Sequence, residues 1–268
     1  MAIRNWDSGD GRLQFVSNDT NDFQKVALPP TGSLVISDDE IHVWRVALEG
    51  GNPEQAQLEQ LLSADEQTRL VRFRSSNDRR RFAIRRGTLR MLLSAYTGVP
   101  GAELCFTHGK NGKPRIEQLP GRVVPCFNTS ASANLALIAV SEHLPLGVDI
   151  EYMRPIGEMH DIASRFFSEQ ERDSLAKLPQ DIQLAGFYRI WTSKEAIIKA
   201  DGRGLSMPLD SFVVSSDPRN PPQLLQTAME AESSKGLTLY GLNPGQKFAG
   251  ALATSRSGLV IRGLALNL

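Results

Sequence analysis

Residues 125–152 decide the fold class, and they read PCFNTSASANLALIAVSEHLPLGVDIEY. Three strands are predicted within this stretch, at residues 125–129, 135–141 and 147–152. They follow one another along the chain with no helix between them. Because strands and helices do not alternate as βαβ units, the sequence predicts an α+β fold rather than a doubly wound parallel sheet.

Helices are predicted on both sides of this stretch. Ser63 and Ser168 each stand three residues before a glutamate, the spacing of a capping box that begins a helix. Longer helices are predicted over residues 78–96, ended by Gly98, and over residues 181–200, ended by Gly202. Further strands are predicted at residues 41–48, 104–107, 237–242, 248–253 and 259–266. We therefore divide the chain into an extension at residues 1–40, expected to lie over the surface, and two halves at residues 41–145 and 146–268.

The composition excludes several classes of protein. The 268 residues carry 30 basic and 30 acidic side chains, so the formal net charge is zero and coating of nucleic acid is not expected. The longest apolar run, Leu135–Val140, is far shorter than the roughly 20 residues of a membrane span. The first residues contain no apolar signal segment. Two cysteines and four histidines give neither a disulfide framework nor a zinc motif. We therefore expect a cytoplasmic protein with neither a membrane nor a nucleic-acid partner.

The predicted strand at residues 147–151 carries two carboxylates on one face. Side chains alternate along a strand, so Val148 and Ile150 point to the core. Asp149 and Glu151 then point the other way, about 7 Å apart. Two carboxylates on one face repel unless a cation or a base lies between them. Such hard oxygen ligands suit Mg²⁺, although a solvated acidic face is the common reason for this pattern.

A second cluster lies on the predicted helix at residues 181–200. Trp191, Glu195 and Lys199 recur every four residues and form one stripe. Ile190 and Ile197 lie on a neighbouring stripe that faces the core. Taken alone, the Glu–Lys spacing also fits an exposed ion pair of little energetic value.

The third cluster is basic. Nine arginines fall between Arg69 and Arg90, with Asp78 the one acid among them. Arg86 shares a helical face with the apolar Phe82, and Arg79 lies about one turn earlier. A guanidinium near a core needs an anionic partner, because an unpaired buried charge is costly. With so little acid nearby, the expected partner is a ligand phosphate or, in competition, a nucleic-acid phosphate.

These clusters stand among further motifs, and the set comprises Gly112–Pro114, Phe127–Ser130, Gly147–Glu151, Arg165–Ser168, Trp191–Lys199, Gly202–Leu205 and Pro208–Phe212. Together and in this order, residues 63–215 resemble the 4′-phosphopantetheinyl transferase superfamily, in its Sfp-type branch. The resemblance implies two similar subdomains related by a pseudo-twofold axis within one chain, with coenzyme A in the cleft between them. It also implies a Mg²⁺-dependent reaction. The 4′-phosphopantetheine arm of coenzyme A is transferred to a serine of an apo acyl or peptidyl carrier protein, and 3′,5′-ADP is released.

The resemblance also assigns roles to residues. Asp149, Glu151 and Glu195 would hold Mg²⁺. Glu195 would take the proton of the carrier serine, and Lys199 would bind the pyrophosphate and assist the leaving group. The catalytic residues implied are Glu195, Lys199 and Asp149. The residues expected to contact coenzyme A are Arg69, Arg79, Arg86, Lys113, Ser130, Asp149, Lys194 and Lys199.

One position departs from the family pattern. Members usually carry a histidine after the serine of the Phe127–Ser130 segment, where it contacts a phosphate of coenzyme A, and Ala131 stands there instead. A methyl group cannot donate a hydrogen bond, and losing such a contact costs about 1.5–3 kcal/mol. The alternative function is therefore a coenzyme A-binding protein that has lost transfer activity. By analogy with the family, we expect a monomer.

Overall fold

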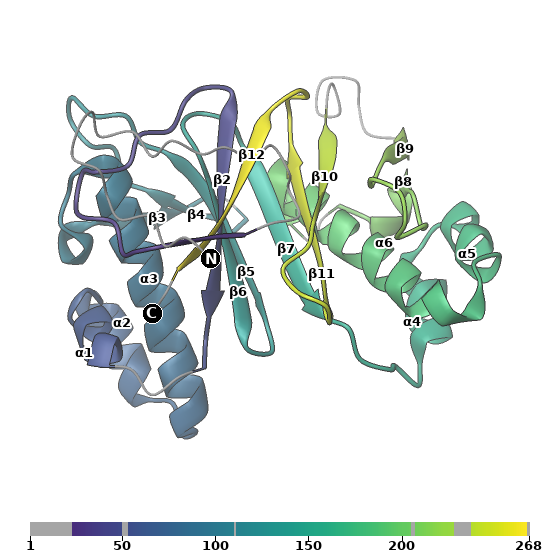
Figure 1. Ribbon diagram of the computed structural model, residues 1–268, viewed down its shortest axis with the longest axis horizontal. Coiled ribbons are helices and arrows are strands. Elements are labelled where there is room, and N and C mark those ends of the chain that lie inside the picture. The colour runs from purple at the N-terminus through teal and green to yellow at the C-terminus, as the bar shows by residue number, and fades with distance from the viewer. Residues whose placement is uncertain (1–22, 50–52, 110, 205–206, 228–236, 267–268) are drawn as a thin grey trace.

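The computed structural model describes residues 23–49, 53–109, 111–204, 207–227 and 237–266. Figure 1 shows two sheets side by side at the centre, with helix α3 (Ser76–Thr97) outside one and helix α6 (Gln180–Asp201) outside the other. This mixture of helices and mainly antiparallel sheets confirms the predicted α+β class. Among the described residues, no helix has the length and apolarity needed to span a bilayer.

The larger sheet takes strands from both ends of the chain. Its order is β1 (Gln24–Val26), β12 (Val260–Leu266), β2 (Glu40–Ala47), β6 (Leu135–Ser141) and β5 (Cys126–Ser132). Strand β12 runs parallel to both β1 and β2, and the other pairs are antiparallel. Residues 23–38 were expected to lie over the surface. Instead they supply β1 and bury Leu34 and Ile36, while residues 1–22 of the expected extension lie outside the described residues.

The smaller sheet is antiparallel, in the order β10 (Thr238–Leu242), β11 (Phe248–Thr254) and β7 (Leu146–Tyr152). The remaining strands form the pairs β3 (Phe106–His108) with β4 (Pro114–Ile116) and β8 (Phe212–Val214) with β9 (Leu224–Thr227). The other helices are α1 (Pro53–Gln60), α2 (Ala64–Val71), α4 (Met159–Phe166) and α5 (Glu169–Ala176). Short 3₁₀ turns η1 and η3 cover Gly101–Glu103 and Leu209–Ser211.

The helix ends follow the sequence signals. Ser63 and Ser168 both form complete capping boxes at the starts of α2 and α5. Gly98 and Gly202 end the two long helices with positive φ angles of 68° and 82°, which an L side chain rarely adopts. These helix starts and stops are therefore confirmed.

Apolar side chains fill the space between successive layers. One cluster joins α3 to the larger sheet through residues such as Trp44 and Leu92. A second joins the two sheets and includes Val43 and Val148. A third joins the smaller sheet to α6 and includes Ile197. The inner strand β6 is buried along its whole length and is apolar up to Ser141, as expected for a sheet covered on both sides.

Candidate active site

The face of β7 that carries Asp149 and Glu151 is turned toward α6. Val148 and Ile150 pack between the two sheets, as the strand alternation predicts. Asp149 is 3% exposed and Glu151 is half-buried, so this is not a solvated acidic face. Their burial requires compensation for two carboxylates.

Gly147 lets helix α6 lie directly on β7. A Cβ atom at Gly147 would stand 2.1 Å from the carbonyl oxygen of Ala196 and 2.4 Å from the amide nitrogen of Ala200. Only glycine permits so close an approach of helix and strand backbones. The approach brings the Glu195–Lys199 turn of α6 against the carboxylate face of β7.

Lys199, Asp149 and Ser130 form the centre of the site. Lys199 Nζ donates to Asp149 Oδ1 at 2.6 Å and to Ser130 Oγ at 3.2 Å. Ser130 Oγ donates in turn to Asp149 Oδ1 at 2.7 Å. The other carboxylate oxygen, Asp149 Oδ2, is buried without a hydrogen-bond donor among the described residues. Protein groups thus satisfy one oxygen of this carboxylate, and the other has no hydrogen-bond partner among the described residues.

Strand β5 joins β7 through side chains rather than through a backbone ladder. Asn128 Oδ1 accepts from the Val148 amide at 2.9 Å. Ser132 Oγ accepts from the Tyr152 amide at 3.0 Å and donates to Glu151 Oε2 at 2.7 Å. Ser132 was missed by the sequence analysis, although Asn128, Ser130 and Ser132 recur with the period of two that places them on one strand face.

The three acids of the site hold protons more strongly than free carboxyls. Burial raises the pKa of Asp149, against the opposing effect of Lys199. Burial also raises the pKa of Glu151, while the hydrogen bond from Ser132 lowers it. For Glu195, burial and the neighbouring Asp149 and Glu151 raise the pKa, and Lys199 lowers it. Mutual repulsion of this kind is relieved by a cation placed among the carboxylates.

The carboxylates are close enough to influence one another but do not converge on one point. In the described part of the chain, three acids or histidines have ligand atoms within 4.8 Å of one another only at Asp38, Glu142 and His143. That group lies on the surface, at least partly exposed. Asp149, Glu151 and Glu195 are more widely spaced.

A cavity of about 660 Å³ opens beside Glu151. Its walls include the apolar side chains of Ile156, Phe187 and Trp191, together with Ser132. Trp191 packs edge-on against Phe166, with ring centroids 5.7 Å apart. The cavity is large enough for a small organic group next to the acidic cluster.

The arginine cluster has an acidic partner that the sequence analysis did not assign. Glu66 accepts from Arg86 Nε and, at 2.6 Å, from Arg90 Nε. Burial raises the pKa of Glu66, but these two guanidinium groups reverse that effect and lower it. The expectation that Arg86 lacks a protein acid is therefore wrong, because Glu66 lies one helix earlier and packs back onto α3.

Arg69 and Arg79 are exposed, and Arg69 lies over the Phe82 ring at 5.2 Å. Arg85, which the sequence analysis passed over, is half-buried. Burial and the neighbouring Arg69 and Arg86 lower its pKa, and no carboxylate in the described ranges lies within 4 Å of it. Like charges therefore repel one another at the outer end of the cluster.

Two lysines lie elsewhere than expected. Lys194 is 1% exposed, donates to Glu171 Oε1 at 2.8 Å and lies on the α5 side of helix α6. In this structure its partners are Glu171 and the carbonyl oxygens of Leu209 and Phe212, not the residues around Asp149. Lys113 Nζ donates to the carbonyl oxygens of Leu146, at 2.8 Å, and Lys199. It ties the β3–β4 hairpin to the end of α6, and burial lowers its pKa to about 8.

Comparison with known proteins identifies the family. The family model of the 4′-phosphopantetheinyl transferase superfamily matches residues 145–252, and that of the 4′-phosphopantetheinyl transferase N-terminal region matches residues 51–143. The chain is 37% identical over 205 residues to 4′-phosphopantetheinyl transferase HetI of Nostoc sp., covering 76% of this chain and 86% of HetI. It is 35% identical to 4′-phosphopantetheinyl transferase ffp of Bacillus subtilis and 32% identical to Sfp of the same species, covering 70% of this chain and 80% of each relative. The chain therefore belongs to the 4′-phosphopantetheinyl transferase superfamily and is a transferase of that kind.

Proposed function

We propose that the protein transfers the 4′-phosphopantetheine arm of coenzyme A to a serine of an apo acyl or peptidyl carrier protein, releasing 3′,5′-ADP in a Mg²⁺-dependent reaction. One observation carries the proposal beyond family membership. The buried Asp149 carboxylate is bound on one oxygen by Lys199 and Ser130, while its second oxygen has no donor in the described chain.

The residues present fit a magnesium ion. Asp149, Glu151 and Glu195 supply the hard carboxylate oxygens that Mg²⁺ prefers, and burial raises the pKa of each. Glu151, which now accepts a hydrogen bond from Ser132, would hold the ion together with Asp149 and Glu195. The ion, when bound, neutralises the charge that develops on the pyrophosphate.

Glu195 is the proposed acceptor of the carrier-serine proton. Its raised pKa brings its basicity closer to neutral pH, where a general base works best. Lys199 would exchange its hydrogen bond with Asp149 for one with the pyrophosphate and stabilise the leaving 3′,5′-ADP. We propose the cavity beside Glu151 and Trp191 as the space where the pantetheine arm meets the carrier.

The arginines would hold the nucleotide phosphates. Arg69 and Arg79 are exposed, and we add Arg85 because its like-charged neighbours favour an anion. Arg86 would contribute positive potential while it remains paired with Glu66. Lys113 would orient this region through its contacts with Leu146 and Lys199 rather than by contacting phosphate.

We propose the same overall plan that the resemblance implies. The two halves, residues 41–145 and 146–268, would form pseudo-twofold-related subdomains with coenzyme A between them, and β12 would complete the sheet of the first half. The working form would be a cytoplasmic monomer without a nucleic-acid partner. The intact cluster of Asp149, Glu151, Glu195 and Lys199 argues against a protein that has lost transfer activity, even with Ala131 exposed on β5.

Intact-mass spectrometry of apo carrier proteins tests the proposal. Incubation with this protein, coenzyme A and Mg²⁺ should add one phosphopantetheine per carrier, and EDTA should prevent the addition. Glu195→Gln should reduce the rate by about 10²–10⁴-fold, the usual contribution of general acid–base catalysis. Asp181→Asn, an exposed acid on the same helix, is the matched control and should react normally.

The outcomes separate the parts of the proposal. Transfer that persists in EDTA would remove the metal assignment but keep the transferase. A normal rate for Glu195→Gln would remove Glu195 as the base. Binding of coenzyme A without transfer to any carrier would favour the non-transferring alternative, and Ala131→His would then be the first change to make.

A further inference from the structure

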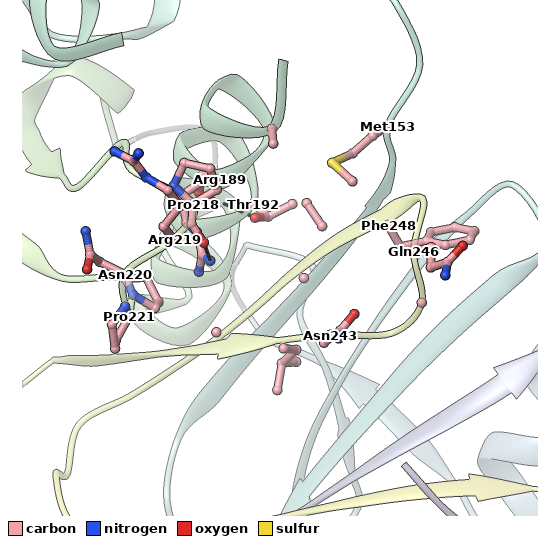
Figure 2. Close-up of a pocket in the computed structure, with 17 residues that line it drawn as sticks. Met153, Arg189, Thr192, Pro218, Arg219, Asn220, Pro221, Asn243, Gln246 and Phe248 are labelled. Atoms are coloured by element: carbon pink, nitrogen blue, oxygen red, sulfur yellow. Dashed lines mark hydrogen bonds between the residues drawn. The ribbon is translucent and has the colours of Figure 1, made fainter. Parts of the chain in front are cut away.

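A second cavity lies in the C-terminal half and contains none of the residues assigned above. It measures about 470 Å³ and lies between α6, residues 218–222 and the β10–β11 hairpin. Figure 2 shows the side chains that line it, with Arg189 and Thr192 on the helix and Asn243, Gln246 and Phe248 around the hairpin. Its volume falls within the range of small-molecule pockets.

Arg189 brings a positive charge to this cavity and forms no direct ion pair with a carboxylate of the described chain. Its Nη2 donates to the carbonyl oxygen of Pro218 at 3.1 Å. No carboxylate in the described segments lies within 4 Å of its guanidinium group. Asp217, the acid that attracts Arg189 electrostatically, accepts hydrogen bonds of 2.7 and 2.9 Å from Arg219. Burial lowers the pKa of Arg189, against the weaker attraction of Asp217. The guanidinium therefore retains donors and charge for a ligand.

Strand β10 leaves room for the Arg189 guanidinium group at Gly241. A Cβ atom at Gly241 in β10 would lie 2.9 Å from Arg189 Nη1 and 3.2 Å from Pro222 Cδ. Any larger residue at this position would push the arginine aside. Gly241 thus keeps Arg189 against the strand, at the edge of the cavity, although the φ angle there needs no glycine.

The remaining lining gives the cavity a consistent chemistry. None of the residues that line it is acidic. Asn243 and Gln246 supply amide groups, while Met153 and Phe248 supply an apolar wall. Guanidinium groups bind carboxylates and phosphates through paired N–H donors. A small molecule with one such oxyanion and a short apolar body matches this set of groups.

We propose that this cavity is a binding site for a small oxyanion, a carboxylate or a phosphate ester, with Arg189 as its anchoring residue. The site is separate from the acidic cluster, but it shares helix α6 with the cluster and includes part of β11, the strand that pairs with β7. Ala249 lines the cavity and pairs with Glu151 across β11 and β7. Arg189 stands on the same helix as Glu195, about 9 Å away along the axis at 1.5 Å per residue. An occupant would therefore contact α6 and the strand that pairs with β7.

Protection from phenylglyoxal, which modifies arginine side chains, tests the site on the intact wild-type protein. The modification of each arginine is followed by peptide mass spectrometry, with sodium phosphate, glycerol phosphate or succinate added in increasing amounts. Arg189 should be protected in a saturable manner by a phosphate-bearing probe or by succinate, and the comparison identifies which oxyanion is preferred. Arg256, an exposed arginine outside the cavity, is the internal control and should react equally throughout.

Calorimetry with the protecting probe supplies the second readout. Arg189→Gln should weaken binding by about 10- to 100-fold, the contribution of a charge-assisted hydrogen bond. The affinity of Arg189→Lys should lie between those of Arg189→Gln and the wild type, because lysine keeps the charge but lacks the paired N–H donors of the guanidinium group. Failure of all three probes to protect Arg189 would overturn the proposal. Unchanged affinity in a folded Arg189→Gln variant would also overturn it.

Discussion

Replacing Lys194 with methionine separates its structural role from the ligand-binding role that the family resemblance implies. In the structure, Lys194 Nζ lies 2.8 Å from Glu171 Oε1 and donates to the carbonyl oxygens of Leu209 and Phe212, at 2.6 and 2.7 Å. Neither charged side chain is more than 1% exposed. Methionine fills a similar volume but leaves the Glu171 carboxylate buried without its cation.

The expected loss of stability is large. Removing one partner of a buried ion pair costs about 3–5 kcal/mol. For a chain of this size, that corresponds to a fall in melting temperature of roughly 6–20 °C. Glu171 also accepts from the Val214 amide at 2.8 Å, so the destabilisation should extend to the end of β8. Lys177→Met, at an exposed position on the neighbouring helix end, should change stability by less than about 0.5 kcal/mol.

Urea unfolding and coenzyme A calorimetry together measure the effect. Lys194→Met should unfold at a lower urea concentration, yet bind coenzyme A with wild-type affinity at a temperature where it stays folded. Adding Glu171→Gln should recover part of the lost stability, because the uncompensated charge is removed. Wild-type stability combined with a tenfold or greater loss of coenzyme A affinity would refute this account of Lys194.

Three further perturbations test other parts of the molecule. Gly147→Ala should destabilise the protein by at least about 1–3 kcal/mol in urea unfolding, because the new methyl group overlaps the Ala196 carbonyl oxygen; equal stability would mean that α6 can shift freely. Ser132→Ala removes a hydrogen bond that lowers the pKa of Glu151, so the acidic limb of the activity profile should move to higher pH. An unmoved limb would show that this carboxylate does not control the rate. Burial lowers the pKa of His42 below 6.5, so the unfolded chain binds more protons and stability should fall as the pH drops below about 6.5. His42→Gln should flatten that dependence in urea titrations at pH 7 and 5.5.

Local signals in the sequence predict the helix ends and the strand faces well. The capping boxes at Ser63 and Ser168 and the glycines at 98 and 202 act over one helical turn, so neighbouring residues suffice to recognise them. The alternation of Val148, Asp149 and Ile150 is local in the same sense. It predicts which face each side chain occupies before the partner of that face is known.

Ion-pair partners that lie far apart in the sequence cannot be predicted in this way. The acid that neutralises Arg86 stands 20 residues earlier, outside the arginine-rich segment, and reaches it only when α2 packs on α3. The partner of Lys194 likewise becomes apparent only when α5 packs on α6. Helix geometry nevertheless predicts different surroundings for the two lysines, because Lys194 and Lys199 are separated by about 140° around an α-helix. The surroundings of Arg85 become apparent only in the folded chain, whereas the period of two places Ser132 on the same strand face as Ser130 and only its partner Glu151 requires the structure.

The position of β12 has a consequence for how the chain matures. It is synthesised after every other described element, yet it pairs with both β1 and β2, and Arg262 reaches Glu40 from 222 residues away. Until residues 260–266 have left the ribosome, the inner edge of β2 has no strand to pair with and is open to wrong partners. Closing such a long loop is also slow. A substitution that disrupts β12 should therefore destabilise the larger sheet, most of which comes from the first half of the chain. A chain whose synthesis stops before residue 260 would leave β2 without its parallel partner.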